Sequence, residues 1–263
     1  MLVVILFWYS PDSVSFDKSS SSYVIYDHFV INDFSQLFKV IFLLSALAVS
    51  IISSSYFKED EPHQAEYYVL LLSSALGMLI TASANDFLTI FVGIELSAFS
   101  SYGLVAFRKT DDKSTEAGAK YLLIGAFSSA LTLYGISLLY ALTGSVTFEG
   151  VNAFLTGIDN GVIDGDFNEL IFISSLFIIA GLGFKIAVVP FHAWAPDVYE
   201  GAPTPVTALL AAASKAMGFV ALFKVFIFTL EPFSDEWSIV LGIIALVSMT
   251  IGNLAALSQK DVG

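Results

Sequence analysis

The 263-residue chain contains no cysteine, which excludes disulfide bonds, thiolate chemistry and iron–sulfur clusters held by cysteine. Its three histidines are scattered and form no metal-ligand pattern. Charged residues make up only 13% of the chain, whereas soluble proteins average about 25%. The net charge is −13 and no basic stripe is present, so nucleic-acid binding is not expected.

Apolar sequence is what the chain has in abundance, with 56% hydrophobic residues and 24 phenylalanines. The apolar runs are each close to the ~20 residues that a helix needs to cross hydrocarbon, and this length favours helices over strands. We therefore predict an all-α integral membrane protein of about seven full transmembrane helices. The expected spans are residues 34–56, 67–84, 87–107, 117–142, 169–189, 205–230 and 237–257.

The remaining segments are expected to be loops, apart from residues 1–9. This apolar stub is too short to cross a bilayer and lacks the basic start of a signal peptide. Lys and Arg gather in alternate segments, here called side A: 57–66, 108–116, 191–204 and 258–263. Side B comprises 10–33, 85–86, 143–168 and 231–236, where Lys18 is the only Lys or Arg. The positive-inside rule places side A in the cytoplasm or matrix.

Three of the charges inside the predicted spans point to function. Glu95 and Lys215 lie near the middle of theirs, and Lys185 lies towards side A, shortly before Pro190. A charge in hydrocarbon costs several kcal/mol, and proline removes a helical hydrogen bond, so irregular backbone must be enclosed by protein or water. The pattern predicts a proton or ion pathway. The competing interpretation is a buried ion pair that only fixes helix packing.

Other charges have less specific interpretations. Lys120 and Lys39 are expected to snorkel to the membrane surface. Lys224 has two open roles, snorkelling to side B or taking part in the relay, and His192 is a relay candidate or a structural histidine.

A long motif then suggests a family. Residues 190–208 read PFHAWAPDVYEGAPTPVTA and are followed by Ser214 and Lys215. With SANDFL at 83–88, GIEL at 93–96 and GFK at 183–185, the chain resembles the subunit 2 family of respiratory complex I, whose bacterial members are called subunit N. The resemblance covers about residues 23–262. It implies an antiporter-like fold in which Glu95, Lys185 and Lys215 relay protons and Pro190 marks a broken helix.

The same resemblance implies a domain division. Residues 1–33 would form the stub and a polar loop, 34–66 a peripheral helix and loop, and 67–230 the first five-helix repeat with one broken helix. Residues 231–263 would hold only the first helix of a second repeat. This predicts a split subunit whose second half is a separate chain; a truncated form of a longer chain is the alternative.

The resemblance implies a non-redox, proton-translocating subunit of NADH:ubiquinone oxidoreductase in the mitochondrial inner membrane, or in the plasma membrane of a prokaryote. No cofactor is expected in this chain, and NADH, FMN, iron–sulfur clusters and ubiquinone would belong to other subunits. Expected partners are lipid and the other membrane-arm subunits. Two alternatives stay open: a subunit of a multisubunit cation/proton antiporter, and a membrane scaffold with inert charge pairs.

Overall fold

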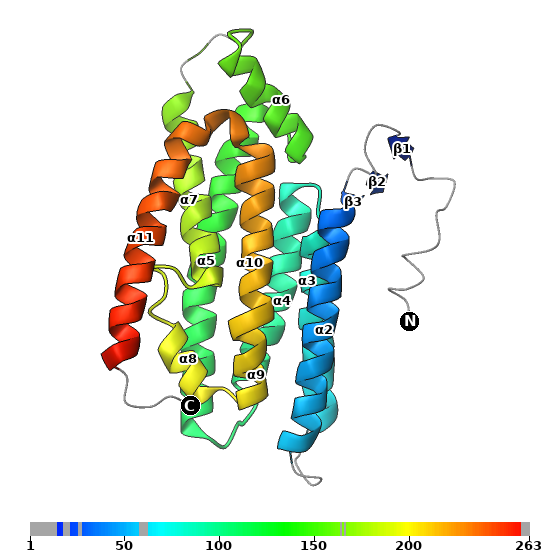
Figure 1. Ribbon diagram of the computed structural model, residues 1–263, viewed down its shortest axis with the longest axis vertical. Coiled ribbons are helices and arrows are strands. Elements are labelled where there is room, and N and C mark those ends of the chain that lie inside the picture. The colour runs from blue at the N-terminus through cyan, green and yellow to red at the C-terminus, as the bar shows by residue number, and fades with distance from the viewer. Residues whose placement is uncertain are drawn as a thin grey trace.

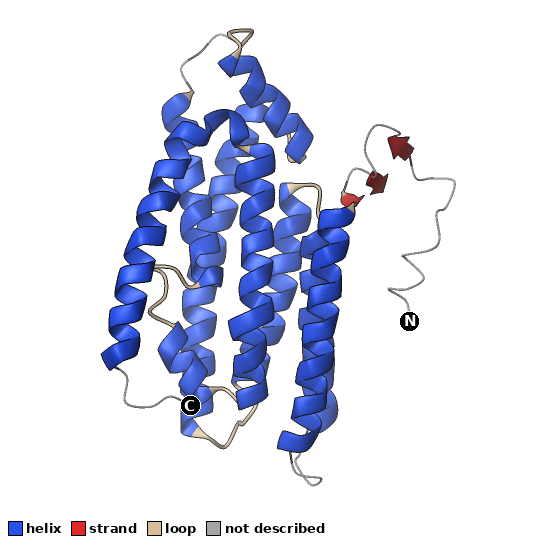
Figure 2. Cartoon of the chain, viewed as in Figure 1, coloured by secondary structure: helices blue, strands red, loops and turns tan. Residues whose placement is uncertain are grey.

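The computed structural model describes residues 15–17, 22–25, 28–57, 63–163, 165 and 167–258, and it is a bundle of long helices (Figure 1). Figure 2 shows how far helix dominates over strand and loop. Within the described residues, seven helices are long and apolar enough to cross a membrane. The predicted all-α integral membrane class is confirmed. The predicted stub at residues 1–9 lies outside the described residues.

The predicted spans match the observed helices, with ends that differ by a few residues. These helices are α2 (Asp33–Tyr56), α3 (Gln64–Ser83), α4 (Phe87–Val105), α5 (Asp112–Thr143), α7 (Asn168–Ile186), a composite helix over Thr204–Thr229, and α11 (Ser234–Ser258). Many of their outward-facing residues are large and apolar, such as Leu123 at 71% exposure, as a lipid-facing surface requires.

Two predicted loops contain regular structure. Loop 143–168 includes α6 (Phe148–Asp159), which buries Phe148, Val151 and Leu155 at helical spacing and is capped by Thr147. At 12 residues α6 is too short to cross a bilayer, so a search for spans overlooks it. Loop 10–33 includes an antiparallel meander of β1 (Ser15–Asp17), β2 (Ser22–Ile25) and β3 (Phe29–Ile31).

The segment after the break and the sixth span are more segmented than predicted. The break is followed by α8 (Ala195–Gly201). The composite helix then consists of α9 (Thr204–Leu209), η1 (Leu210–Ser214), α10 (Lys215–Leu222) and η2 (Phe223–Thr229), and η3 (Glu231–Phe233) turns the chain into α11. Both η1 and η2 are π-helical, a conformation that often marks functional sites.

Small residues let the helices approach closely. Gly77 on α3 faces Gly93 and Ser97 on α4, and a Cβ added at Gly77 would lie 2.5 Å from the Ser97 nitrogen. The Ser74 and Ser97 hydroxyls also lie 3.1 Å apart across this contact. Apolar burial supplies little drive between helices in lipid, so such close packing and interhelical hydrogen bonds hold the bundle together.

The two predicted sets of loops lie at opposite ends of the bundle. In Figure 1, α6 and the start of α2 are at the upper end, whereas α8 and the start of α9 are at the lower end. The parity argument from the sequence therefore agrees with the arrangement of the described helices.

Candidate functional site

The break in α7 comes earlier than predicted. The span was expected to reach Val189, but α7 ends at Ile186 and Ala187 adopts a left-handed conformation with φ of 56°. Proline disfavours helical geometry in the residue before it, so the helix ends ahead of Pro190. Two bonds satisfy the freed backbone: the Trp194 indole donates to the Phe184 carbonyl at 3.1 Å, and the Val189 N–H donates to the Ser248 hydroxyl at 3.0 Å.

Lys185 lies in the last turn of α7, at this break, and is only 5% exposed. Its Nζ lies 5.8 Å from the ring centroid of Tyr102 and 5.7 Å from that of Phe184. Aromatic faces and the partial negative charge of a helix C-terminus both favour a cation. The structure therefore holds the ammonium beside π systems and backbone dipoles.

Glu95 lies on α4, half-buried, and its Oε1 accepts a hydrogen bond of 2.5 Å from the Ser129 hydroxyl of α5. Within the described residues, no ion pair joins Glu95 to Lys185 or Lys215. The two groups are connected through Tyr102, which lies on α4 with Glu95 and whose ring centroid is 5.8 Å from Lys185 Nζ. The competing interpretation from the sequence was a buried ion pair that only fixes helix packing, and among the described residues Glu95 forms no such pair.

Lys215 opens α10, directly after the π-helical segment η1, and is half-buried. Its Nζ lies 5.5 Å from the ring centroid of Tyr199, a residue of α8. Burial raises the pKa of the Tyr199 phenol to about 12, so this side chain keeps its proton at neutral pH. Lys215 is therefore paired with a neutral aromatic alcohol from the segment that follows the break.

A continuous aromatic cluster connects the surroundings of the two lysines. Tyr102 contacts Tyr121 at 4.8 Å between ring centroids, Tyr121 stacks on Trp194 at 4.7 Å, and Trp194 contacts Tyr199 at 5.9 Å. Phe184 packs against Trp194 at 5.0 Å. The Tyr102 and Tyr199 hydroxyls are buried without a hydrogen-bond partner within the described residues. Free hydroxyls in such a position can bind water or pass on a proton.

Sequence reasoning missed this cluster, although part of it had a signal. Tyr102 lies seven residues after Glu95, which is two helical turns and therefore the same face. Ser129, Tyr121 and Tyr199 come from other elements, and no spacing in the sequence connects them with Glu95 or the lysines.

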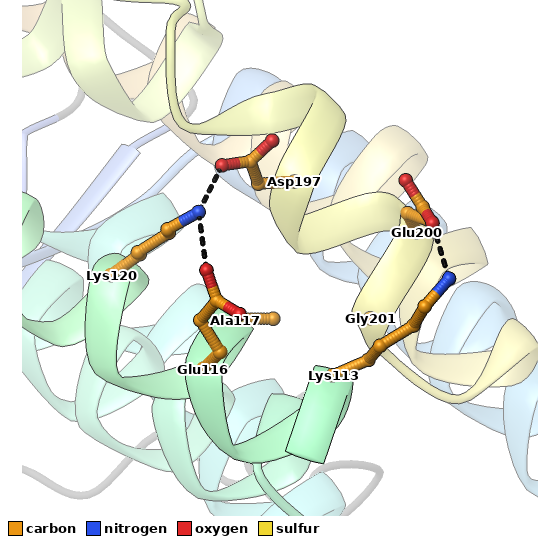
Figure 3. Close-up of a pocket in the computed structure, with 7 residues that line it drawn as sticks. All are labelled: Lys113, Glu116, Ala117, Lys120, Asp197, Glu200 and Gly201. Carbon is orange, nitrogen blue, oxygen red and sulfur yellow. Dashed lines mark hydrogen bonds and ion pairs between the residues drawn. The ribbon is translucent and has the colours of Figure 1, made fainter. Parts of the chain in front are cut away.

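The segment after the break is fixed to α5 by ion pairs on side A (Figure 3). Lys120 Nζ lies 2.6 Å from Asp197 and 2.8 Å from Glu116, and Lys113 Nζ lies 2.7 Å from Glu200. These side chains border a cavity of about 160 Å³ and are largely exposed. Exposed pairs add little stability, so their main effect is to orient α8. Lys120 does reach the surface, as predicted.

The remaining candidates lie apart from this centre. His192 is half-buried in the segment between α7 and α8, and its Nδ1 has no partner within the described residues. No hydrogen bond brings it to Lys185 or Lys215 in that part of the chain. For Lys224 the sequence left two roles open, snorkelling to side B or taking part in the relay. Its side chain is only 4% exposed and its Nζ donates to the Ala84 carbonyl at 2.6 Å, so it does not snorkel to the surface. The carbonyl at the end of α3 holds it inside the bundle.

Taken together, these features define a multi-pass membrane protein with a broken helix, a buried lysine and a half-buried lysine, both beside aromatic side chains, and ion-translocating subunits belong to this class. Residues 84–262 match the family model described as NADH:quinone oxidoreductase/Mrp antiporter, transmembrane. The chain belongs to this family.

Individual relatives agree with this assignment. The chain is 44% identical to NADH-quinone oxidoreductase subunit N of Desulfitobacterium hafniense over 88% of its own length and 45% of the relative. It is 41% identical to subunit N of Heliobacterium modesticaldum, over its whole length and 52% of that protein. The chain therefore spans about half the length of these curated relatives.

Solved structures show the same fold. A chain of respiratory complex I from Thermus thermophilus with bound aureothin gives a TM-score of 0.74 at 31% identity, over 92% of this chain and 49% of the other. The Mrp complex of a Dietzia species gives a TM-score of 0.72 at 21% identity, over 98% and 46% of the two chains. At that identity the second likeness concerns the fold alone.

Proposed function

We propose that this chain is a proton-translocating, membrane-arm subunit of NADH:quinone oxidoreductase. The observation that carries the proposal is Lys185, a buried ammonium at a helix break, with Glu95 nearby but held by Ser129 instead of a direct ion pair. Relatives named NADH-quinone oxidoreductase subunit N support the particular complex.

The geometry suggests how the relay works. Glu95 and Tyr102 lie on the same face of α4, and the Tyr102 ring lies 5.8 Å from Lys185 Nζ, so a change in the charge of Glu95 would be felt at Lys185. A proton released there can move through water held by the free Tyr102 and Tyr199 hydroxyls towards Lys215. The three groups act as one coupled system, in which each proton position depends on the others.

Other subunits would complete the machine. We propose that NADH, FMN, iron–sulfur clusters and ubiquinone belong to them, since this chain has no cysteine to hold an iron–sulfur cluster. Bacterial relatives favour a plasma membrane over the mitochondrial inner membrane expected from the sequence, with side A in the cytoplasm. A second repeat would pack beside α11, and its supply by a separate chain remains a prediction, tested by identifying the chains that co-purify.

A cation/proton antiporter is the second candidate, because the description of the matching family names the Mrp antiporter beside the oxidoreductase. Purification of the chain without any NADH-oxidising subunit would favour it. A passive scaffold is the third candidate, and it predicts that the buried lysines can be replaced without functional loss.

The experiment replaces Lys185 or Lys215 with Met in the assembled complex. We expect assembly and NADH:quinone reduction to persist, while protons pumped per electron in proteoliposomes fall at least twofold. Lys109→Met, at an exposed lysine on side A, is the matched control and should pump normally. Normal pumping by both buried-lysine variants would contradict the relay and support the scaffold.

A further inference from the structure

A second buried lysine, Lys224, lies on η2 and borders a cavity with α6 and the start of α2. Figure 1 shows α6 and the start of α2 at the end of the bundle opposite α8. There a cavity of about 270 Å³ opens between the start of α2, the turn from α3 to α4, α6 and η2. A water molecule occupies about 30 Å³ of the liquid, so the cavity has room for several. Its lining combines polar and apolar side chains: Val30, Asn32, Phe34, Ala84, Asn85, Phe148, Glu149, Asn152, Lys224 and Phe228.

Lys224 forms part of this lining and is the buried charge within it. Its Nζ has three donors, of which one is used by the Ala84 carbonyl at 2.6 Å. Within the described residues, no carboxylate lies within ion-pair distance of Lys224. A buried ammonium without a counterion is costly unless its remaining donors find water or an anion.

The other ionisable groups nearby favour water over an anion. Lys39 of α2 adds a second positive charge, but the carboxylate of Glu149 borders the same cavity. Asp86, at the start of α4, is already bonded to Thr89 and to His28, which lies at the surface. A carboxylate in the lining disfavours an anionic occupant, whereas the polar groups around the cavity can bind water.

Lys224 is also separate from the pathway through Lys185 and Lys215. It lies nine residues after Lys215 on the same composite helix. At roughly 100° per residue, nine residues make about two and a half turns, so the two side chains lie on opposite faces of this helix. Its segment η2 is π-helical, and the side chain of Asn152 from α6 binds its last carbonyl, that of Thr229, at 3.0 Å. The cavity is therefore built jointly by α6 and η2.

We propose that Lys224 is a proton-exchange site that opens to water on side B through this cavity. The exchange is the transfer of one proton from the ammonium to a cavity water, which leaves a neutral amine and a hydronium ion, and its reverse. The inference rests on the proposed function because it gives the subunit a second point of proton access.

The first experiment tests whether the cavity contains water, and it exploits the absence of cysteine from the chain. Asn152→Cys in the assembled complex is treated with a membrane-impermeant cationic methanethiosulfonate, and labelling is read on this chain after electrophoresis. We expect labelling from side B only. Leu123→Cys, on the lipid-facing surface of α5, is the control and should not react. An unreactive Asn152→Cys would overturn the proposal, as would protection by millimolar inorganic phosphate, which would indicate an anion site.

The second experiment tests proton exchange. Lys224→Met should lower protons pumped per electron at least twofold with Asn152→Cys labelling unchanged, and Lys224→Arg should assemble and pump no better than Lys224→Met, since arginine does not release its proton. Unchanged pumping by Lys224→Met would overturn the proposal. Normal pumping by the Lys185 and Lys215 variants would instead contradict the proposed function, while the labelling would still report on the cavity.

Discussion

Trp194 connects the break in α7 to the aromatic cluster, and its replacement separates two effects. The side chain is 3% exposed, packs on Tyr121, Phe184 and Tyr199, and donates its indole N–H to the Phe184 carbonyl. Trp194→Ala removes a buried aromatic side chain and should cost about 3–5 kcal/mol. Trp194→Phe keeps an aromatic ring but loses the hydrogen bond from the indole to the Phe184 carbonyl. This loss should lower the free energy of unfolding by only about 0.5–1.5 kcal/mol, because the carbonyl still accepts a hydrogen bond from the Ala187 N–H.

The assay combines thermal unfolding of the purified complex with proton pumping in proteoliposomes. Both Trp194 variants should melt earlier, the alanine variant by far the more, and both should pump fewer protons per electron because the carbonyl of Phe184 immediately precedes Lys185. Trp237→Phe is the matched control: its indole donates to the Leu230 carbonyl, which also keeps a second donor, from Phe233. It should lose similar stability and pump normally. Equal pumping defects at Trp194 and Trp237, or none at either, would refute the reasoning.

Two further predictions concern packing and the free hydroxyls. Gly77→Val should prevent stable assembly because its Cβ would lie 2.5 Å from the Ser97 nitrogen. Gly242→Val on α11 should assemble, because a Cβ there meets nothing within 4 Å among the described residues; equal yields of the two variants in membrane preparations would contradict the close contact at Gly77. Tyr199→Phe keeps the ring but removes a hydroxyl that has no hydrogen-bond partner among the described residues, so it should leave the melting temperature unchanged and lower pumping. Tyr134→Phe, at an exposed position, is the control and should pump normally.

The sequence predicted the parts of this molecule that membrane physics constrains most. Among the described residues, span length located the seven helices that can cross a membrane, and the cost of a charge in hydrocarbon singled out Glu95, Lys185 and Lys215. The short helix α6 escaped because its apolar residues mark one face and never form a long run. The π-helical segments escaped because an extra residue in a helical turn leaves no signature in hydropathy.

The immediate surroundings of the candidate site were harder to predict, for a different reason. That Ser129 holds Glu95 and that Tyr199 covers Lys215 depends on which helices become neighbours. Apolar helices in lipid carry little information about their neighbours in their hydropathy, because lipid tails are as apolar as leucine. Such contacts become visible only when the helices are placed beside one another.

The bond between the Val189 N–H and the Ser248 hydroxyl has a mechanical consequence. It fastens the non-helical segment behind Lys185 to α11, a helix whose apolar span has no fully buried side chain among the described residues. At 3.0 Å the bond tolerates a displacement of only a few tenths of an ångström before it weakens. Beyond that, the stranded donor costs about 1–3 kcal/mol. A displacement of α11 should therefore either move the segment beside Lys185 with it or break this hydrogen bond.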